Sequence, residues 1–245
     1  MSINLTETLN TQTTIKDLIR QRPRRAWVLE KHGVDICASQ TKPLADACAQ
    51  YYVVPDTLLG ELRHHDAATA TPDTRDWNTA SLRDLIDHIL EKHHAYMRRA
   101  LPRISKIQAH VAPRHGHQHP VLHELLPTFQ ALRADLEMHT MKEEQILFPM
   151  LIAIEQGSDN RGSHCGSVAN PIRMMEMEHE GADNGVARLR ALTNNYQPTE
   201  DACTMHRVLF DALHELDDDI HVHIHKENDI LFPRGLALEK ANQSA

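Results

Sequence analysis

The sequence is poor in the residues that build β-sheets and disulfide frameworks. Aromatic residues make up only 4% of the 245 residues, so leucine, isoleucine, methionine and alanine must fill most of any core. That composition favours helices over sheets. The four cysteines form no Cys-x-x-Cys pair and no dense framework, which is typical of a protein from a reducing compartment. The sequence therefore predicts an all-α protein.

Long apolar runs and an excess of positive charge are also missing. No segment has the length of a membrane-spanning helix, and the first residues, MSINLTETLNTQTT, lack the apolar core of a signal peptide. The formal net charge of −8 implies no basic surface for nucleic acid. We therefore expect a cytoplasmic protein without a nucleic-acid or membrane partner.

Helical patterns divide the chain into two regions. Residues 1–63 predict a small helical domain, and the polar stretch 64–76, rich in Ala, Thr, Asp and Pro, predicts a linker. Residues 77–245 carry four long helical patterns with mostly short connections. Four such helices predict an up-down four-helix bundle.

The four helical patterns of the second region have recognisable starts and interruptions. The first opens with a capping box, Ser81-Leu-Arg-Asp84. Pro149 and Pro233 fall inside the second and fourth patterns, where we expect breaks because proline lacks the backbone donor of a helix interior. The patterns cover residues 81–113, 120–155, 171–194 and 200–240.

Histidine is the residue that the sequence has in excess, with 19 in all, and His139 and His223 open the two copies of an internal repeat. HTMKEEQILFP starts at His139 and HIHKENDILFP starts at His223, and the two segments share seven of eleven positions. The duplication indicates two helical hairpins related by a pseudo-two-fold axis. In each copy a glutamate, Glu143 or Glu227, follows the histidine by four residues, so both side chains lie on one helix face.

The residues on this face suit a metal centre. The apolar Ile-Leu-Phe-Pro after each pair places it near the core, where an unpaired carboxylate is costly. Two buried glutamates can share cations, with imidazoles as terminal ligands and carboxylates as bridges, a set that suits iron. The other two helices offer Glu91-Lys-His-His94 and Glu176-Met-Glu-His179. We therefore predict metal ligation by His94, His139, Glu143, His179, His223 and Glu227.

Neighbouring histidines compete for two of these positions. The Glu-x-x-His spacing favours His94 over His93, and the repeat favours His223 over the rival face formed by His221 and His225. A ferritin-like di-iron site also uses Glu-x-x-His, on two helices. The His-x-x-x-Glu pairs do not belong to that scheme and favour a site richer in histidine.

Several residues near the motifs are expected to lie outside the site. Glu144 should point about 100° away from Glu143 on the helix. Glu178 is expected beside the site or on the surface, and His206 in solvent. His115 lies 21 residues after His94, roughly 31 Å along one helix, so we do not expect it to reach the metal.

Residues Trp77–Leu238 resemble the hemerythrin-like domain of the RIC family (repair of iron centres, the ScdA/YtfE-like group). HTMKEEQILFP, HIHKENDILFP and PIRMMEMEHEGAD are similar to its signatures, and roughly the first 70 residues, with HGVDIC, are similar to its small N-terminal domain. The resemblance implies two non-haem iron ions bridged by carboxylates and an oxo or hydroxo group. The family's adjacent pair of cysteines is here Cys37-Ala38, so Cys37 is a candidate redox thiol without its usual neighbour.

The resemblance also implies a function. It predicts repair of iron–sulfur clusters damaged by nitrosative or oxidative stress, with nitric oxide or another small diatomic ligand and iron–sulfur client proteins as partners. Two alternatives stay open: a protein that sequesters or senses nitric oxide, and an enzyme that reduces it. The residues decide neither whether the chain is an enzyme nor whether it forms a homodimer.

Overall fold

The computed structural model describes residues 9–68, 73, 75–157 and 166–244. Helices dominate these residues, and none of them forms a β-strand, which confirms the all-α prediction. They fall into two compact units. One unit is Met1–Thr74 with Gln197–Ala212, and the other is Arg75–Tyr196 with Leu213–Ala245.

The first unit is built from short helices around a small apolar core. Helix α5 (Pro55–Ala68) continues five residues beyond residue 63 and into the predicted linker. It continues because Asp66 pairs with the buried guanidinium of Arg25 at 2.8 Å. Leu18, Leu29 and Leu58 are fully buried in this unit. Its helices are α1 (Ile15–Gln21), η1 (Pro23–Arg25), α2 (Ala26–Lys31), α3 (Ile36–Ser39), α4 (Leu44–Gln50) and α5 (Pro55–Ala68).

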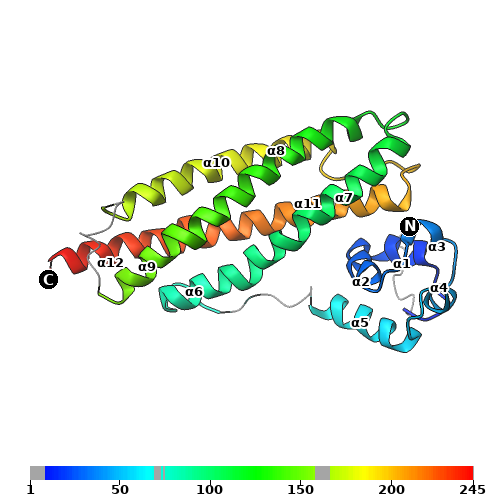
Figure 1. Ribbon diagram of the computed structural model, residues 1–245, viewed down its shortest axis with the longest axis horizontal. Coiled ribbons are helices and arrows are strands. Elements are labelled where there is room, and N and C mark those ends of the chain that lie inside the picture. Colours follow the sequence, from blue (N-terminus) through cyan, green and yellow to red (C-terminus); the bar gives the residue numbers. More distant parts are fainter. Residues whose placement is uncertain (1–8, 69–72, 74, 158–165, 245) are drawn as a thin grey trace, which may run out of the picture. The chain divides into compact units, whose positions relative to one another are not determined.

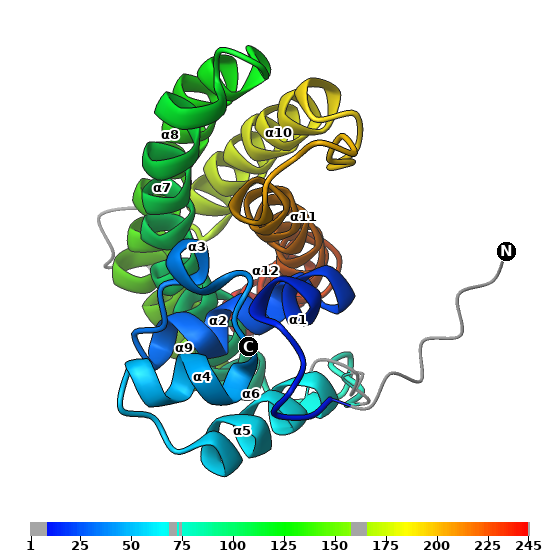
Figure 2. The same cartoon turned by 90° about the vertical axis from the view of Figure 1, so that its right-hand side faces the viewer.

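Four long helical stretches carry the second unit and run alongside one another (Figures 1 and 2). The first begins as predicted at Ser81, whose side chain accepts a hydrogen bond from the backbone N–H of Asp84. Three of the four stretches contain a π-helical segment. In order they are α6 (Leu82–Ile89), η2 (Leu90–His94) and α7 (Ala95–His115); α8 (Val121–Lys142), η3 (Glu143–Leu147) and α9 (Phe148–Glu155); α10 (Ala169–Leu192); and α11 (Thr204–His225), η4 (Lys226–Leu231) and α12 (Phe232–Ser244).

The breaks expected at Pro149 and Pro233 are wrong, because both helices continue past the proline. Each proline is preceded by a π-helical segment, in which the residue before the proline donates its N–H to the carbonyl five residues earlier. These carbonyls belong to Glu143 and Glu227. Proline breaks a regular α-helix because it lacks a donor and clashes with the carbonyl four residues earlier. We attribute the continuity of both helices to the wider π-helical turn, which changes the carbonyl that lies opposite each proline.

The apolar core of the second unit borders the predicted ligands. Leu85 and Ile89 of α6 and Leu151 of α9 are fully buried there. Phe148 and Phe232, which open α9 and α12, belong to the same cluster. Among the described residues, no helix is both long enough and apolar enough to cross a membrane.

Candidate metal centre

The six residues predicted to bind metal lie together in the second unit. They form two groups, and in each group one ligand atom from every member lies within 4.8 Å of the others. All six side chains are buried. The groups are His94, Glu143, His223 and Glu227, and His139, Glu143, His179 and Glu227.

The π-helical segments position three of these side chains. His94 is the last residue of η2, Glu143 is the first of η3, and Glu227 is the second of η4. A π-turn inserts extra backbone into a helix and is frequent at functional sites. The His139–Glu143 and His223–Glu227 spacings still bring each pair onto one face, with their closest atoms 3.3 Å and 2.9 Å apart.

The chemistry of the buried group fits cations. Glu143 and Glu227 are both 0% exposed, and no hydrogen bond from the described residues reaches either oxygen of Glu143. Nε2 of His139 and Nε2 of His179 lie 3.1 Å apart, facing each other across the group. Buried carboxylates without hydrogen bonds are costly unless a cation or a metal compensates their charge. Facing imidazole nitrogens beside two fully buried carboxylates, Glu143 and Glu227, are a donor set for metal.

The carboxylates also shift the pKa values of the surrounding histidines. Burial alone would lower the pKa of His139, but the negative charge of Glu143 outweighs it and raises the pKa to about 9. Burial would also lower the pKa of His94, but Glu143 outweighs it, so that this pKa is raised as well. Burial would raise the pKa of Glu227, but His223 and His179 lower it well below its usual value. Protons therefore compete with a metal for the imidazoles.

Glu144 has a role that the sequence analysis missed. It is not a member of either group, as expected, but its Oε1 lies 2.8 Å from Nδ1 of His94. Arg98 donates to the same oxygen at 2.6 Å. A carboxylate on Nδ1 fixes the orientation of an imidazole and leaves Nε2 free to bind metal. Glu144 is therefore a support for His94, and the pattern of the sequence gave no signal of this contact between helices.

The histidines of the second group have similar outer partners. Glu178 Oε2 lies 3.1 Å from Nδ1 of His139, and the same carboxylate pairs with Lys142. Asn228 Oδ1 lies 2.8 Å from Nδ1 of His179. The structure therefore places Glu178 beside the site, as predicted.

His93, the neighbour that the Glu-x-x-His spacing disfavours, belongs to neither group of ligands. Its Nδ1 lies 2.8 Å from Asp219, and its ring stacks on His223 with centroids 5.4 Å apart. Its Nε2 lies 3.3 Å from Nζ of the buried Lys226, which in turn lies 2.8 Å from Nε2 of His88. The repeat alone could not reveal this network, because its members come from α6, η2, α11 and η4.

Other histidines and the cysteine fall outside the site. His221 and His225 are exposed and contact aspartates on their own helical stretch, so His223 alone of the three enters a group. His115 ends the uninterrupted helix α7 and belongs to neither group. Cys37 lies in α3 and is partly exposed.

The expectation that His206 faces solvent is wrong. The residue is 2% exposed, and its ring meets that of Phe210 edge-on with centroids 4.5 Å apart. It lies in the first turns of α11, which belong to the first unit. Those turns are buried on the face that carries His206, and local polarity in the sequence does not reveal this. His164 and Cys165 lie outside the described residues.

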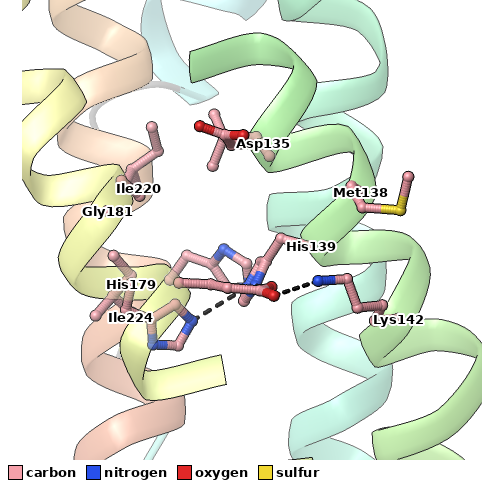
Figure 3. Close-up of a pocket in the computed structure, with 12 residues that line it drawn as sticks. Asp135, Met138, His139, Lys142, His179, Gly181, Ile220 and Ile224 are labelled. Carbon is pink, nitrogen blue, oxygen red and sulfur yellow. Dashed lines mark hydrogen bonds and ion pairs between the residues drawn. The ribbon is translucent and has the colours of Figure 1, made fainter. Parts of the chain in front are cut away.

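A pocket reaches the metal centre from outside (Figure 3). Its volume is about 240 Å³, and α8, α10 and α11 supply its walls. His139, His179 and His223 are among the residues that line it. Figure 3 shows His139 and His179 directed toward each other, with Lys142 beside them. A pocket of this size admits a small ligand to the histidines.

Comparisons with known proteins agree with this geometry. Residues 85–235 match the hemerythrin HHE cation binding domain. The chain is 34% identical to "Iron-sulfur cluster repair protein YtfE" of Cronobacter sakazakii and 35% identical to that of Escherichia coli O81, in each case over 89% of this chain and 93% of the relative. It is 32% identical to "Probable iron-sulfur cluster repair protein" of Haemophilus influenzae, over 92% of this chain and 97% of the relative. The chain therefore belongs to the hemerythrin HHE cation-binding family and, within it, to the RIC group that its motifs resemble.

Proposed function

We propose that this protein repairs iron–sulfur clusters damaged by nitrosative or oxidative stress, and that a di-iron centre in the six-residue site supplies the iron. The observation that carries this proposal is the buried group of four histidines and two glutamates. It occurs in a chain whose relatives are named iron–sulfur cluster repair proteins. The partners are then iron–sulfur client proteins, reached in the cytoplasm.

The roles of the residues follow from their places in the two groups. Glu143 and Glu227 belong to both groups, so each carboxylate would bridge two ions, whereas every histidine serves one ion. Glu144 and Glu178 accept from Nδ1 of their histidines and so turn Nε2 toward the site. Iron held by these residues would supply a Lewis acid able to bind a small diatomic ligand.

A second function, binding of nitric oxide without cluster repair, is favoured by a different observation. The pocket of about 240 Å³ leads from outside to three histidines of the site and has room for a diatomic ligand. Cys37 has no adjacent cysteine, so a dithiol at that place cannot assist in repair. Reduction of nitric oxide at the same centre is the third outcome that an experiment must separate.

The test starts from iron content. Protein made with ample iron should carry about two irons per chain, as di-iron bundle proteins do. Glu143→Gln, which keeps the size of the side chain but removes its charge, should lose both irons. Glu180→Gln is the matched control, because Glu180 is exposed on α10. A single zinc, or absence of metal despite ample iron, would contradict the proposed site.

Activity assays then separate the three functions. The iron-loaded protein is incubated with a client protein whose cluster was destroyed by nitric oxide, and recovery of the client's cluster absorption is followed. Recovery that requires the iron-loaded protein and is lost in Glu143→Gln supports repair. Stoichiometric nitrosyl formation without recovery and without nitrous oxide indicates sequestration. Release of nitrous oxide, again without recovery, indicates a reductase.

A further inference from the structure

We propose that the two metal positions are unequal, and that the iron held between His139 and His179 is the one released to a client. This inference rests on the proposed function, in which the site holds two irons and donates iron. The observation behind it is that the pocket reaches the two groups of ligands unequally.

Access to the pocket separates the two positions. Both histidines of one group, His139 and His179, line it, and Figure 3 shows their rings facing each other. In the other group, His94 is not among the lining residues. The side chains of His139 and His179 are 6% and 3% exposed, and those of His94 and His223 are 0% and 2% exposed. An incoming ligand therefore meets the His139–His179 position first.

The position between His94 and His223 is enclosed more completely. Phe148 stacks on the ring of His94 at 5.6 Å between centroids, on the side of the apolar core. His223 does line the pocket, but His93 stacks on one face of its ring. Asp219, 2.8 Å from Nδ1 of His93, holds the His93 ring in place. A metal leaving this position has to pass the other one or displace buried side chains that pack closely.

Both groups have outer hydrogen bonds, so bracing of the imidazoles does not by itself distinguish them. His179 contacts Asn228 and stacks on Phe232 at 6.0 Å, much as His94 contacts Glu144 and stacks on Phe148. The two metal positions differ in the residues that separate each of them from the pocket. Access is therefore the feature that makes one iron labile and the other retained.

The route outward offers replacement ligands. Glu178 lines the pocket, touches His139 and is partly exposed, so its carboxylate is the first oxygen donor beside the site. Asp135 and Met138 line the same pocket and are exposed. A cation leaves a buried site by exchanging ligands in steps, and carboxylates are ligands of non-haem iron. The pocket therefore provides such steps for iron from the His139–His179 position.

Gly181 allows the pocket to be narrowed without touching a predicted ligand. It lines the pocket, and a Cβ built there meets no atom within 4 Å. Gly181→Leu therefore places a branched side chain in the pocket, and leucine is a better helix former than glycine, so α10 keeps its fold. Asn184→Leu is the matched control, because Asn184 is exposed one turn further along the same helix.

The experiment uses the full-length iron-loaded protein, reduced with dithionite and mixed with 2,2′-bipyridine. We expect release in two phases of equal amplitude. Gly181→Leu should slow the fast phase by about tenfold, the effect of a barrier raised by about 1.4 kcal/mol. Asn184→Leu should leave both phases unchanged. Release of both irons at one rate, or a fast phase that Gly181→Leu leaves unaltered, overturns the inference.

Diffraction identifies the position that empties. Crystals of the loaded protein are soaked briefly in the chelator, and anomalous scattering of iron is measured before and after. We expect the iron signal between His139 and His179 to disappear first, while the signal between His94 and His223 remains. The opposite order overturns the inference. Protein that loads about two irons but loses them in the wrong order refutes only this assignment. Protein that loads no iron refutes the proposed function itself.

Discussion

Raising the pH should destabilise the metal-free protein between about pH 6.5 and pH 9. Burial lowers the pKa of His139, but the negative charge of Glu143 outweighs it and raises the pKa from 6.5 to about 9. The folded chain therefore keeps this imidazole protonated over an interval in which the unfolded chain does not. The folded state binds one proton more, so stability falls as pH rises.

The size of the effect follows from the width of that interval. The shift from 6.5 to about 9 spans roughly 2.5 units, and at 1.36 kcal/mol per unit it amounts to about 3 kcal/mol of unfolding free energy. The contribution is complete below about pH 6.5 and is lost as pH passes about 9. His139 and Glu143 are both buried, so solvent screens their attraction little.

Urea unfolding of the iron-free protein, followed by far-ultraviolet circular dichroism, measures this loss. His139→Gln removes the titrating group. Over the same pH range, the unfolding free energy of this variant should therefore fall by about 3 kcal/mol less than that of the unaltered chain. His225→Gln should behave as the unaltered chain, because His225 is exposed. Iron-loaded protein should not show the loss, because metal replaces the proton on the imidazole. Stability that is flat or rises with pH in the iron-free chain, or an unchanged loss in His139→Gln, would refute the reasoning.

Three further predictions concern single residues. Glu143→Gln should abolish iron binding, whereas Glu180→Gln should keep it, as iron analysis of the two purified proteins will show. His179→Ala should lower iron occupancy and shift the visible spectrum, whereas His115→Ala should leave both unchanged; equal loss would mean that α7 is misplaced. Ser81→Ala should lower the unfolding free energy by about 1 kcal/mol through loss of the helix cap, with iron content unaltered; a neutral result would assign the cap elsewhere.

The helices and the composition of the ligand group were predictable because both depend on local periodicity. An interval of four residues places His139 and Glu143 on one face of a helix whatever the rest of the fold is. The repeat then transfers the same reasoning to His223 and Glu227. The four long helical patterns with mostly short connections added the up-down bundle, and the structure brings the six expected side chains together.

What could not be predicted depends on contacts between helices and on departures from regular geometry. Glu144 was expected to point away from the site, yet it supports His94 across the gap between two helices. Pro149 was expected to break its helix, because the sequence does not show that the turn before it is π-helical. The stacking of His93 on His223 joins residues 130 positions apart and leaves no periodic signal.

The internal repeat divides the ligand set evenly between the two halves of the bundle. The half that ends with α9 provides His94, His139 and Glu143, and the half that begins with α10 provides His179, His223 and Glu227. Each metal position draws on both halves, so neither hairpin carries a complete site. Two separately expressed fragments would therefore each be unable to hold the metal pair. Metal uptake on mixing the two fragments would show that the halves had associated.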